Sequence, residues 1–419
     1  ATGQLYGITS SSRIVVIQPT TGIARYIGAT PFSPAINGSI VAFDFNPTVD
    51  RIRIITSSGQ NLRANPETGA IVATDGNING QAGAIITGAG YTNNAAGVTS
   101  TTLYDIDKVS NNLYTQVPPN NGTLNLVGSL GLDVEDGEFD IAGATDAFGL
   151  FNINNKSTLI AVDLSTGQAN IITPYPVTYK AFAIATSPVA YAADGNNNLH
   201  IFNPSVYYSE ANLNTIISKP ITGLSAGDSI RGIDFRPANG QLYALGKNGN
   251  IYTINTASAA ATLSATLSVP LTGNSFGFDF NPVVDRIRII SNAGQNLRFN
   301  PADGTVIQDL PINPSTAAVS GAAYTNNFAG TTSTILYGLD ITSNQLVQIA
   351  PPNNGTLVPV GVLPFRADAA NGFDIGGTSG NAYALTRLAT NNRSRVYQIN
   401  LSTGAASGGS IIGTEIGRA

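Results

Sequence analysis

The chain has no cysteine, no methionine and no tryptophan among its 419 residues, and it has a single histidine. Without cysteine no disulfide can form, so stability must come from packing and hydrogen bonding. The same absence excludes cysteine nucleophiles and, with one histidine, the usual zinc ligand sets. Any Ser-His-Asp triad would have to use His200. This histidine lies in the run Asn-Leu-His-Ile-Phe, which favours an ordinary strand residue.

Charged residues are also scarce, at 11% of the chain against about 25% in ordinary soluble domains. The surface must therefore be built mainly from Asn, Thr, Ser, Gln and Gly. The net charge is only −5 and no basic run occurs, which argues against nucleic acid as a partner. A weakly charged surface has little self-repulsion, and this favours association between copies of the chain.

Residue 1 is Ala, and no initiator methionine is present. We interpret this as the removal of a secretory signal and expect a secreted protein, extracellular or at the cell surface. The alternative is that residue 1 is an arbitrary boundary and not the result of signal removal. No apolar run approaches the roughly 18 residues that a membrane-spanning helix needs, so we expect no membrane span.

One stretch of the chain occurs twice. Residues 42–66 read AFDFNPTVDRIRIITSSGQNLRANP and residues 277–301 read GFDFNPVVDRIRIISNAGQNLRFNP, so 19 of the 25 aligned positions are identical at an offset of 235 residues. In each copy, alternation of apolar and polar residues is broken by Gly, Pro and Asn. This pattern is typical of consecutive antiparallel strands.

The repeated unit holds about four such strands in about 40 residues, the content of one propeller blade. We therefore predict an all-β fold, a β-propeller of about nine four-stranded antiparallel units that close as one large ring or as two smaller rings. The expected units lie near residues 4–28, 40–75, 85–130, 137–175, 179–221, 230–267, 275–312, 319–363 and 370–413.

Units one to four match units six to nine, which predicts two repeat copies at residues 1–178 and 179–419. We favour one ring, because residues 181–188 run into residues 190–195 as an apparent local hairpin with no linker. The first unit lacks its first strand, since the chain starts on the equivalent of the second strand of unit six. We expect a neighbouring molecule to supply that strand, the alternative being that residues 410–416 fold back to close the ring.

These runs resemble a family of bacterial secreted domains that is catalogued only as a domain of unknown function. The resemblance rests on the runs Phe-Asp-Phe-Asn-Pro, Val-Asp-Arg-Ile-Arg, Gly-Gln-Asn-Leu-Arg and Pro-Pro-Asn-Asn-Gly-Thr-Leu, and it covers nearly the whole chain. It implies a secreted β-propeller-like protein in two tandem copies, the first lacking its opening unit. It implies no activity, cofactor or catalytic residue.

Aspartates recur at one position inside the first strand of several units, where a propeller lines its axis. They could ring a channel and hold a cation. Alternatively, each could accept backbone N–H bonds at the following turn or pair with an arginine at position 51, 53, 286 or 288. We interpret them, with the Asp and Arg residues of Val-Asp-Arg-Ile-Arg, as structural repeat positions. The positions are Asp44, Asp50, Arg51, Arg53, Asp140, Asp234, Asp279, Asp285, Arg286, Arg288 and Asp374.

The densest acidic run, Asp133 to Asp140, lacks the full pattern of known calcium loops, so we interpret it as a solvated loop. No pair of carboxylates stands out as that of a glycosidase, and the sequence has neither a phosphate-binding loop nor a nucleophile elbow. We therefore predict no catalytic residue, no cofactor-binding residue and no metal ligand.

The composition and the repeats together favour a secreted, non-catalytic propeller that acts as an extracellular structural or adhesive protein. Its expected partner is itself, in a homo-oligomer or filament. The alternative is a monomeric extracellular module that binds a glycan or a cation. An enzyme of the lactonase or lyase kind rests on analogy with other propellers alone.

Overall fold

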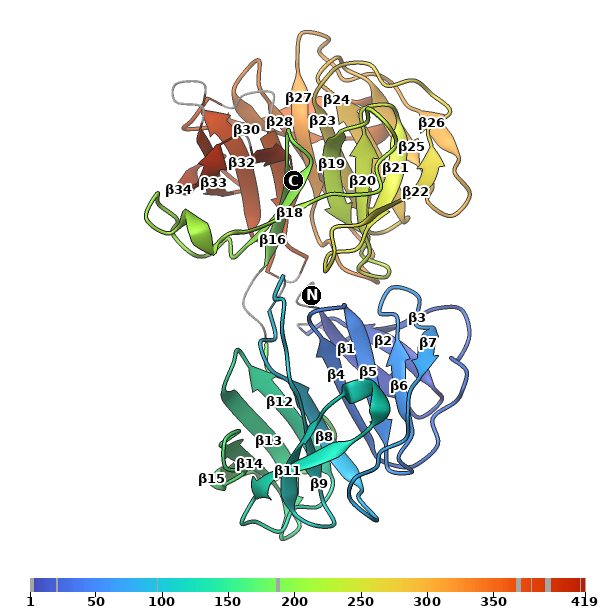
Figure 1. Ribbon diagram of the computed structural model, residues 1–419. Helices are drawn as coiled ribbons and strands as arrows, with labels where there is room; N and C mark the ends of the chain where they lie inside the picture. The colour runs from blue at the N-terminus through green and yellow to red at the C-terminus, as the bar shows by residue number, and fades with distance from the viewer. Residues whose placement is uncertain are drawn as a thin grey trace. The chain divides into compact units, whose positions relative to one another are not determined.

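The computed structural model describes residues 4–19, 22–95, 97–185, 189–366, 371–377, 379–388, 393–414 and 416–418. Within these residues the regular structure consists of β-strands and three short 3-10 helices, at Pro119–Asn121, Leu213–Thr215 and Pro352–Asn354. No helix of this part of the chain is long and apolar enough to cross a membrane. The predicted all-β propeller class is confirmed (Figure 1).

The chain divides into two compact units, each of which contains several of the four-stranded repeat units of the sequence analysis. The first unit comprises residues 1–17 and 24–187, and the second unit comprises residues 188–419 and 18–23. The single ring favoured from the sequence is therefore wrong. The expected hairpin between residues 181–188 and 190–195 is absent from the described residues, because residues 181–185 carry no strand and Ala190–Asp194 pairs elsewhere.

The first unit contains four antiparallel sheets. The first sheet is β1 (Leu5–Thr9), β2 (Arg13–Ile17) and β3 (Ala24–Ile27), and the second is β4 (Val41–Asn46), β5 (Arg51–Thr56), β6 (Asn61–Ala64) and β7 (Ile71–Thr74). The third is β8 (Ile86–Tyr91), β9 (Leu103–Asp107), β10 (Asn112–Gln116) and β11 (Leu124–Ser129). The fourth is β12 (Gly137–Ala142), β13 (Asp146–Ile153), β14 (Lys156–Val162) and β15 (Ala169–Pro174).

The second unit contains five sheets of four strands. The first two are β16 (Ala190–Asp194), β17 (Asn198–Phe202) and β18 (Ile217–Pro220) with β35 (Ile416–Arg418), then β19 (Ile230–Phe235), β20 (Leu242–Gly246), β21 (Asn250–Ile254) and β22 (Ala261–Thr266). Next come β23 (Phe276–Asn281), β24 (Arg286–Ser291), β25 (Asn296–Phe299) and β26 (Val306–Gln308). The last two are β27 (Val319–Tyr324), β28 (Leu336–Asp340), β29 (Gln345–Ile349) and β30 (Leu357–Val362), then β31 (Asn371–Ile375), β32 (Ala382–Leu388), β33 (Arg393–Ile399) and β34 (Ala406–Thr414).

Within each compact unit, successive sheets stack face to face, so a strand can be covered on both of its faces. In β24, Ile287 and Ile289 are buried in a cluster with the preceding sheet, while Ile290 is buried in a cluster with the following sheet. Because both faces of these strands are covered, the residues that point to either face are buried. One sheet alone would leave these faces exposed, which is why the sheets occur as an array.

The carboxyl-terminal strand completes the second unit. β35 pairs antiparallel with β16, and it lies beside β31 of the last sheet and β19 of the next. The first strands β19, β23, β27 and β31 follow one another, so β35 closes their ring. The alternative that residues 410–416 fold back to close the first repeat unit is wrong, because Ala406–Thr414 forms β34 and Ile416–Arg418 pairs with β16 of the fifth repeat unit.

The first sheet has three strands, with β1 at its edge and paired only with β2 among the described strands. Its missing first strand agrees with the sequence analysis. All five residues of β1 are half-buried, whereas all five of its counterpart β20, which has a strand on each side, are buried. β1 therefore presents an edge that β20 does not.

Candidate functional site

The aspartates of the first strands join neighbouring sheets. In Asp44, one carboxylate oxygen accepts the backbone N–H of Phe45 at 2.6 Å, and the other accepts the N–H of Tyr91 in the next sheet at 2.6 Å. The same position repeats this bonding: Asp140 accepts from Ile141 and Ile184, Asp234 from Phe235 and Phe280, Asp279 from Tyr324, and Asp374 from Ile375. These donors lie in the same strand or in a neighbouring sheet or segment, and not at the following turn, where the sequence analysis expected the backbone bonds.

Three of these carboxylates also meet at the axis of the second unit. Asp234, Asp279 and Asp374 each offer an oxygen that lies within 4.8 Å of the other two, the only such acidic group among the described residues. Burial raises the pKa of all three, and the charge of Asp374 raises the pKa of Asp234 further. Because like charges this close repel, a proton or a cation is needed to neutralise part of the group.

In the first unit the carboxylates of Asp44, Glu138 and Asp140 interact electrostatically, and Glu138 is a residue that the sequence analysis placed only in a loop. Burial and then the negative charges of Asp140 and Asp44 raise the pKa of Glu138. Burial followed by the charge of Asp140 raises the pKa of Asp44. The sequence contained a signal for this placement of Glu138, because residues 138 and 140 lie on the same face of a strand whose side chains alternate between its two faces.

A buried arginine fixes the contact between the second and third sheets. Arg53, 2% exposed, donates to Asn61 at 2.7 Å, to Asp75 at 2.6 Å and to Asn120 at 2.8 Å, and also to the Tyr91 hydroxyl. Asp75 accepts two further bonds from Arg63. The guanidinium thus crosslinks strands and a loop up to 67 residues away, as a charge-assisted donor of several bonds can.

The second copy repeats this network at every position. Arg288 donates to Asn296, Asp309, Asn353 and the Tyr324 hydroxyl, and Asp309 also pairs with Arg298. The carboxylate partner of Arg288 is thus Asp309, which follows the fourth strand, rather than the axial aspartate suggested by the sequence. The recurrence of an Asp directly after the fourth strand of both copies was a signal that could have identified it.

The other members of Val-Asp-Arg-Ile-Arg serve the turn before the second strand. Asp50 and Asp285 take left-handed backbone conformations with φ of 50° and 52°, which Asp tolerates better than most residues. Arg51 and Arg286 donate to backbone carbonyls of this turn. The carboxylate of Asp285 pairs with Arg236 of the preceding sheet, with its Nε at 2.8 Å, and not with an arginine of its own motif.

Asp105 is a buried acidic residue that no sequence pattern marked. It is 0% exposed in β9, and neither carboxylate oxygen has a hydrogen-bond partner. Burial raises its pKa to about 8, an effect that the positive charge of Arg53 reduces. The equivalent position in β28 is Gly338, so no repeat pattern marked it. The carboxyl is therefore largely neutral at pH 7.

His200 and the acidic run have structural contacts. His200 Nε2 lies 3.1 Å from one carboxylate oxygen of Asp194. The other oxygen of Asp194 accepts backbone N–H groups of its own turn. In the acidic run the carboxylates have separate partners: Asp133 accepts from Asn111, Glu135 from Asn152 and Asp136 from Lys108. These contacts direct the carboxylates of the run to different side chains.

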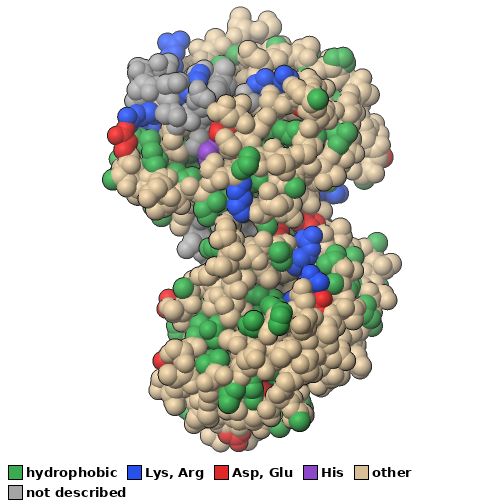
Figure 2. All heavy atoms as spheres, in the orientation of Figure 1, with side chains coloured by type: hydrophobic (Ala, Val, Ile, Leu, Met, Phe, Trp, Pro, Cys, Tyr) green, Lys and Arg blue, Asp and Glu red, His purple; other side chains and the backbone are tan. Residues whose placement is uncertain are grey.

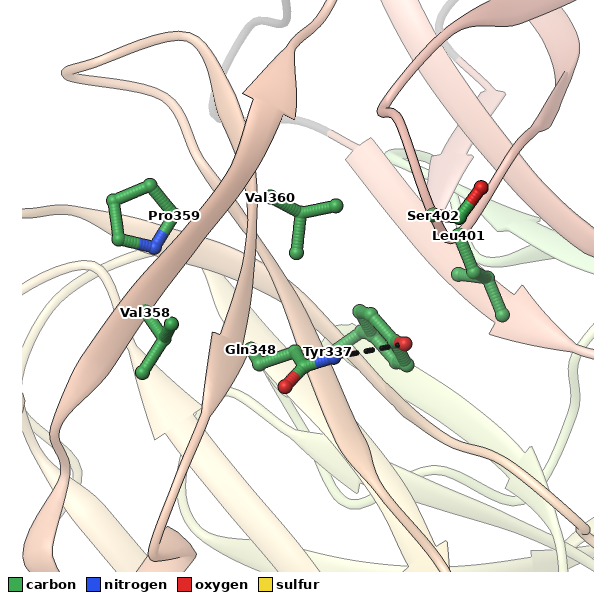
Figure 3. A pocket seen from close by; sticks show the side chains of 7 residues that line it. All are labelled: Tyr337, Gln348, Val358, Pro359, Val360, Leu401 and Ser402. Carbon is green, nitrogen blue, oxygen red and sulfur yellow. Dashed lines mark hydrogen bonds between the residues drawn. The ribbon is translucent and has the colours of Figure 1, made fainter.

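A shallow groove lies on the second unit between the sheets of β30 and β33–β34. Tyr337 and Gln348, joined by a 3.0 Å hydrogen bond, line it together with Val358, Pro359, Val360, Leu401 and Ser402 (Figure 3). No charged side chain lines it. The groove offers aromatic and amide groups but no acid-base pair.

Comparisons with known proteins agree with the repeat. The model of a family described as a domain of unknown function (DUF4394) matches residues 1–185 and 206–417. The two segments confirm the resemblance and the two tandem copies found in the sequence. No curated protein matches the chain.

Two solved structures are similar at low identity. A crystal structure of selenomethionine-substituted virginiamycin B lyase from Staphylococcus aureus has 12% identity and a TM-score of 0.27, with 71% of this chain and 91% of that chain covered. PorZ, a surface component of the type-IX secretion system of Porphyromonas gingivalis, has 11% identity and a TM-score of 0.27. The match covers 95% of this chain but spans about half the length of PorZ, 50%. Neither similarity carries an argument about function.

Proposed function

Because the chain belongs to a family of domains of unknown function, which assigns it no activity, we propose that it is a secreted, non-catalytic structural or adhesive protein that assembles with copies of itself. The observation that carries the proposal is the edge of β1: among the strands that the structure describes, it ends its sheet where every other sheet has a further inner strand. Open strand edges recruit strands from other chains.

The surface supports this proposal. Figure 2 shows on one face that Lys, Arg, Asp and Glu side chains are sparse among uncharged ones, in agreement with the charged content of 11%. Strand addition bonds the backbones of two chains in one orientation. A head-to-tail contact of this kind propagates into a filament unless its rotation closes it, so a small number of contacts would give a long assembly.

We expect the mass of the protein in light scattering to rise with concentration, and Leu5→Lys to reduce association at least tenfold. Leu5 is half-buried in β1, whereas its counterpart Leu242 is 1% exposed, so a lysine at position 5 keeps part of its side chain in solvent but opposes a strand that docks on β1. The matched control is Ile171→Lys on the outer strand β15, 51% exposed, which should assemble normally. A wild-type chain that stays monomeric at high concentration would disprove self-association.

A cation bound at the axial group is the second candidate, favoured by the convergence of Asp234, Asp279 and Asp374. Carboxylate oxygens are the ligands that Ca²⁺ and Mg²⁺ prefer. We expect calcium chloride to raise the thermal midpoint of the wild type by several degrees and to have no such effect on Asp279→Asn, with exposed Asp133→Asn as control. Equal midpoints in calcium and in EDTA would exclude this candidate without bearing on self-association.

A further inference from the structure

Residues 181–185 lie after the last strand of the first unit and have the pattern of an inner strand without a strand partner. Their exposure alternates, with Ala181, Ala183 and Ala185 exposed and Phe182 and Ile184 half-buried. The structure assigns no secondary structure to them. Alternation of this kind is what an extended segment shows when one side rests on the protein.

A hydrogen bond places this segment at the axis. The backbone N–H of Ile184 donates to the Asp140 carboxylate at 2.7 Å. Between other neighbouring sheets, the same bond to the axial aspartate comes from the first strand of the following sheet: Tyr91 in β8 to Asp44, Phe280 in β23 to Asp234, and Tyr324 in β27 to Asp279. Ile184 thus occupies the position of the first strand of the next sheet.

Among the described strands of this unit, the sheet without a first strand is that of β1. The second unit solves the same problem with a segment beyond its last sheet, because β35 follows β34 and completes the sheet of β16 to β18. Residues 181–185 follow β15 in the same way. We propose that residues 181–185 can supply the strand that β1 lacks, either within one chain or, by exchange, between chains.

The second copy gives the register of this pairing. Aligning Lys180-Ala-Phe-Ala-Ile with Arg231-Gly-Ile-Asp-Phe places Ile184 at the position of Phe235, which pairs with Leu242, the counterpart of Leu5. Ile184 therefore lies opposite Leu5, and Ala181 lies opposite Ile8, as Gly232 lies opposite Leu245. The exchange of this segment between copies rests on the proposed self-association, whereas the pairing itself does not.

The absence of cysteine makes an engineered disulfide a clean test. We expect Ile8→Cys with Ala181→Cys to oxidise to a disulfide in most molecules, because Cβ atoms directly opposite on antiparallel strands are about 4.5–5.5 Å apart. The matched control is Ile8→Cys with Ala185→Cys. That pair is displaced by four residues, about 13 Å along the strand, and its yield should be at least tenfold lower.

The products separate the two proposals. A disulfide within one chain, in a protein that remains monomeric, supports the pairing and contradicts self-association. A ladder of disulfide-linked chains on a non-reducing gel supports both. Equal yields from the two cysteine pairs, or no disulfide in either, overturns the pairing, and light scattering then still decides self-association.

A measurement on the wild type tests the pairing without any structural change caused by the cysteine substitutions. Hydrogen exchange should show β1 amides protected to the level of β20 if a strand covers the β1 edge, since paired amides exchange only on opening. Free exchange of the β1 amides that do not bond to β2, at every concentration, would overturn the pairing.

Discussion

Arg288→Met is expected to lower the free energy of unfolding of the second unit by about 3–5 kcal/mol, the cost of breaking a buried ion pair by removing one partner. Arg288 is 2% exposed and holds Asp309, Asn296 and Asn353. The substitution leaves two amide oxygens and part of a buried carboxylate without their donor. Urea unfolding followed by circular dichroism, with the transition of the second unit analysed separately, measures the change.

Arg286→Met in the same strand is the control, since Arg286 donates only to backbone carbonyls of Val284 and Asp285 on a partly exposed face. It should cost less than about 1 kcal/mol. Equal losses for Arg286→Met and Arg288→Met would mean that the buried network is not what joins the sheets. Arg53→Met tests the same network in the first unit and should affect that unit alone.

Asp105→Ala is expected to remove a loss of stability that the wild type suffers as pH rises. The folded pKa of Asp105 is raised to about 8 by burial, and in the unfolded chain an aspartate has a pKa of about 3.9. Stability is therefore unaffected by this group below about pH 4, falls as pH rises, and reaches its full loss above about pH 8. The loss amounts to up to about 6 kcal/mol, since the pKa differs by about four units and one unit corresponds to about 1.4 kcal/mol.

The measurement is the difference in unfolding free energy between the wild type and Asp105→Ala at pH values from 4 to 9. The variant should gain relative to the wild type with each unit up to about pH 8. A protonated carboxyl band in infrared difference spectra, lost with the same midpoint, would assign the effect to this side chain. A difference that does not change with pH would contradict the prediction.

The first sheet connects the function proposed here with the architecture. A complete second unit and an incomplete first unit within one chain give an internal comparison, because β20 and β1 are counterparts with and without an inner neighbour. Assembly and closure compete for the same backbone groups of β1. Which of them prevails is set by whether residues 181–185 pair within the chain or between chains.

The sequence determined the local architecture of this protein. Alternation and turn residues placed nearly every sheet within a few residues, because a strand's side-chain period and its Gly, Pro and Asn turns depend on neighbours along the chain. The duplication then showed that the sheets recur, and the incomplete first unit was visible as a missing Gly-Ile-Asp-Phe run. These features need no knowledge of distant contacts.

Tertiary structure alone decided how the ends are used and where the buried charges meet. The pairing of β35 with β16 joins residues more than 200 apart, and its three residues carry no pattern that names their partner. The bond from Arg53 to Asn120 and the meeting of Asp234, Asp279 and Asp374 arise when sheets stack around an axis. Asp105 is unpartnered because packing buried it, and burial depends on what covers a strand rather than on the strand's own residues.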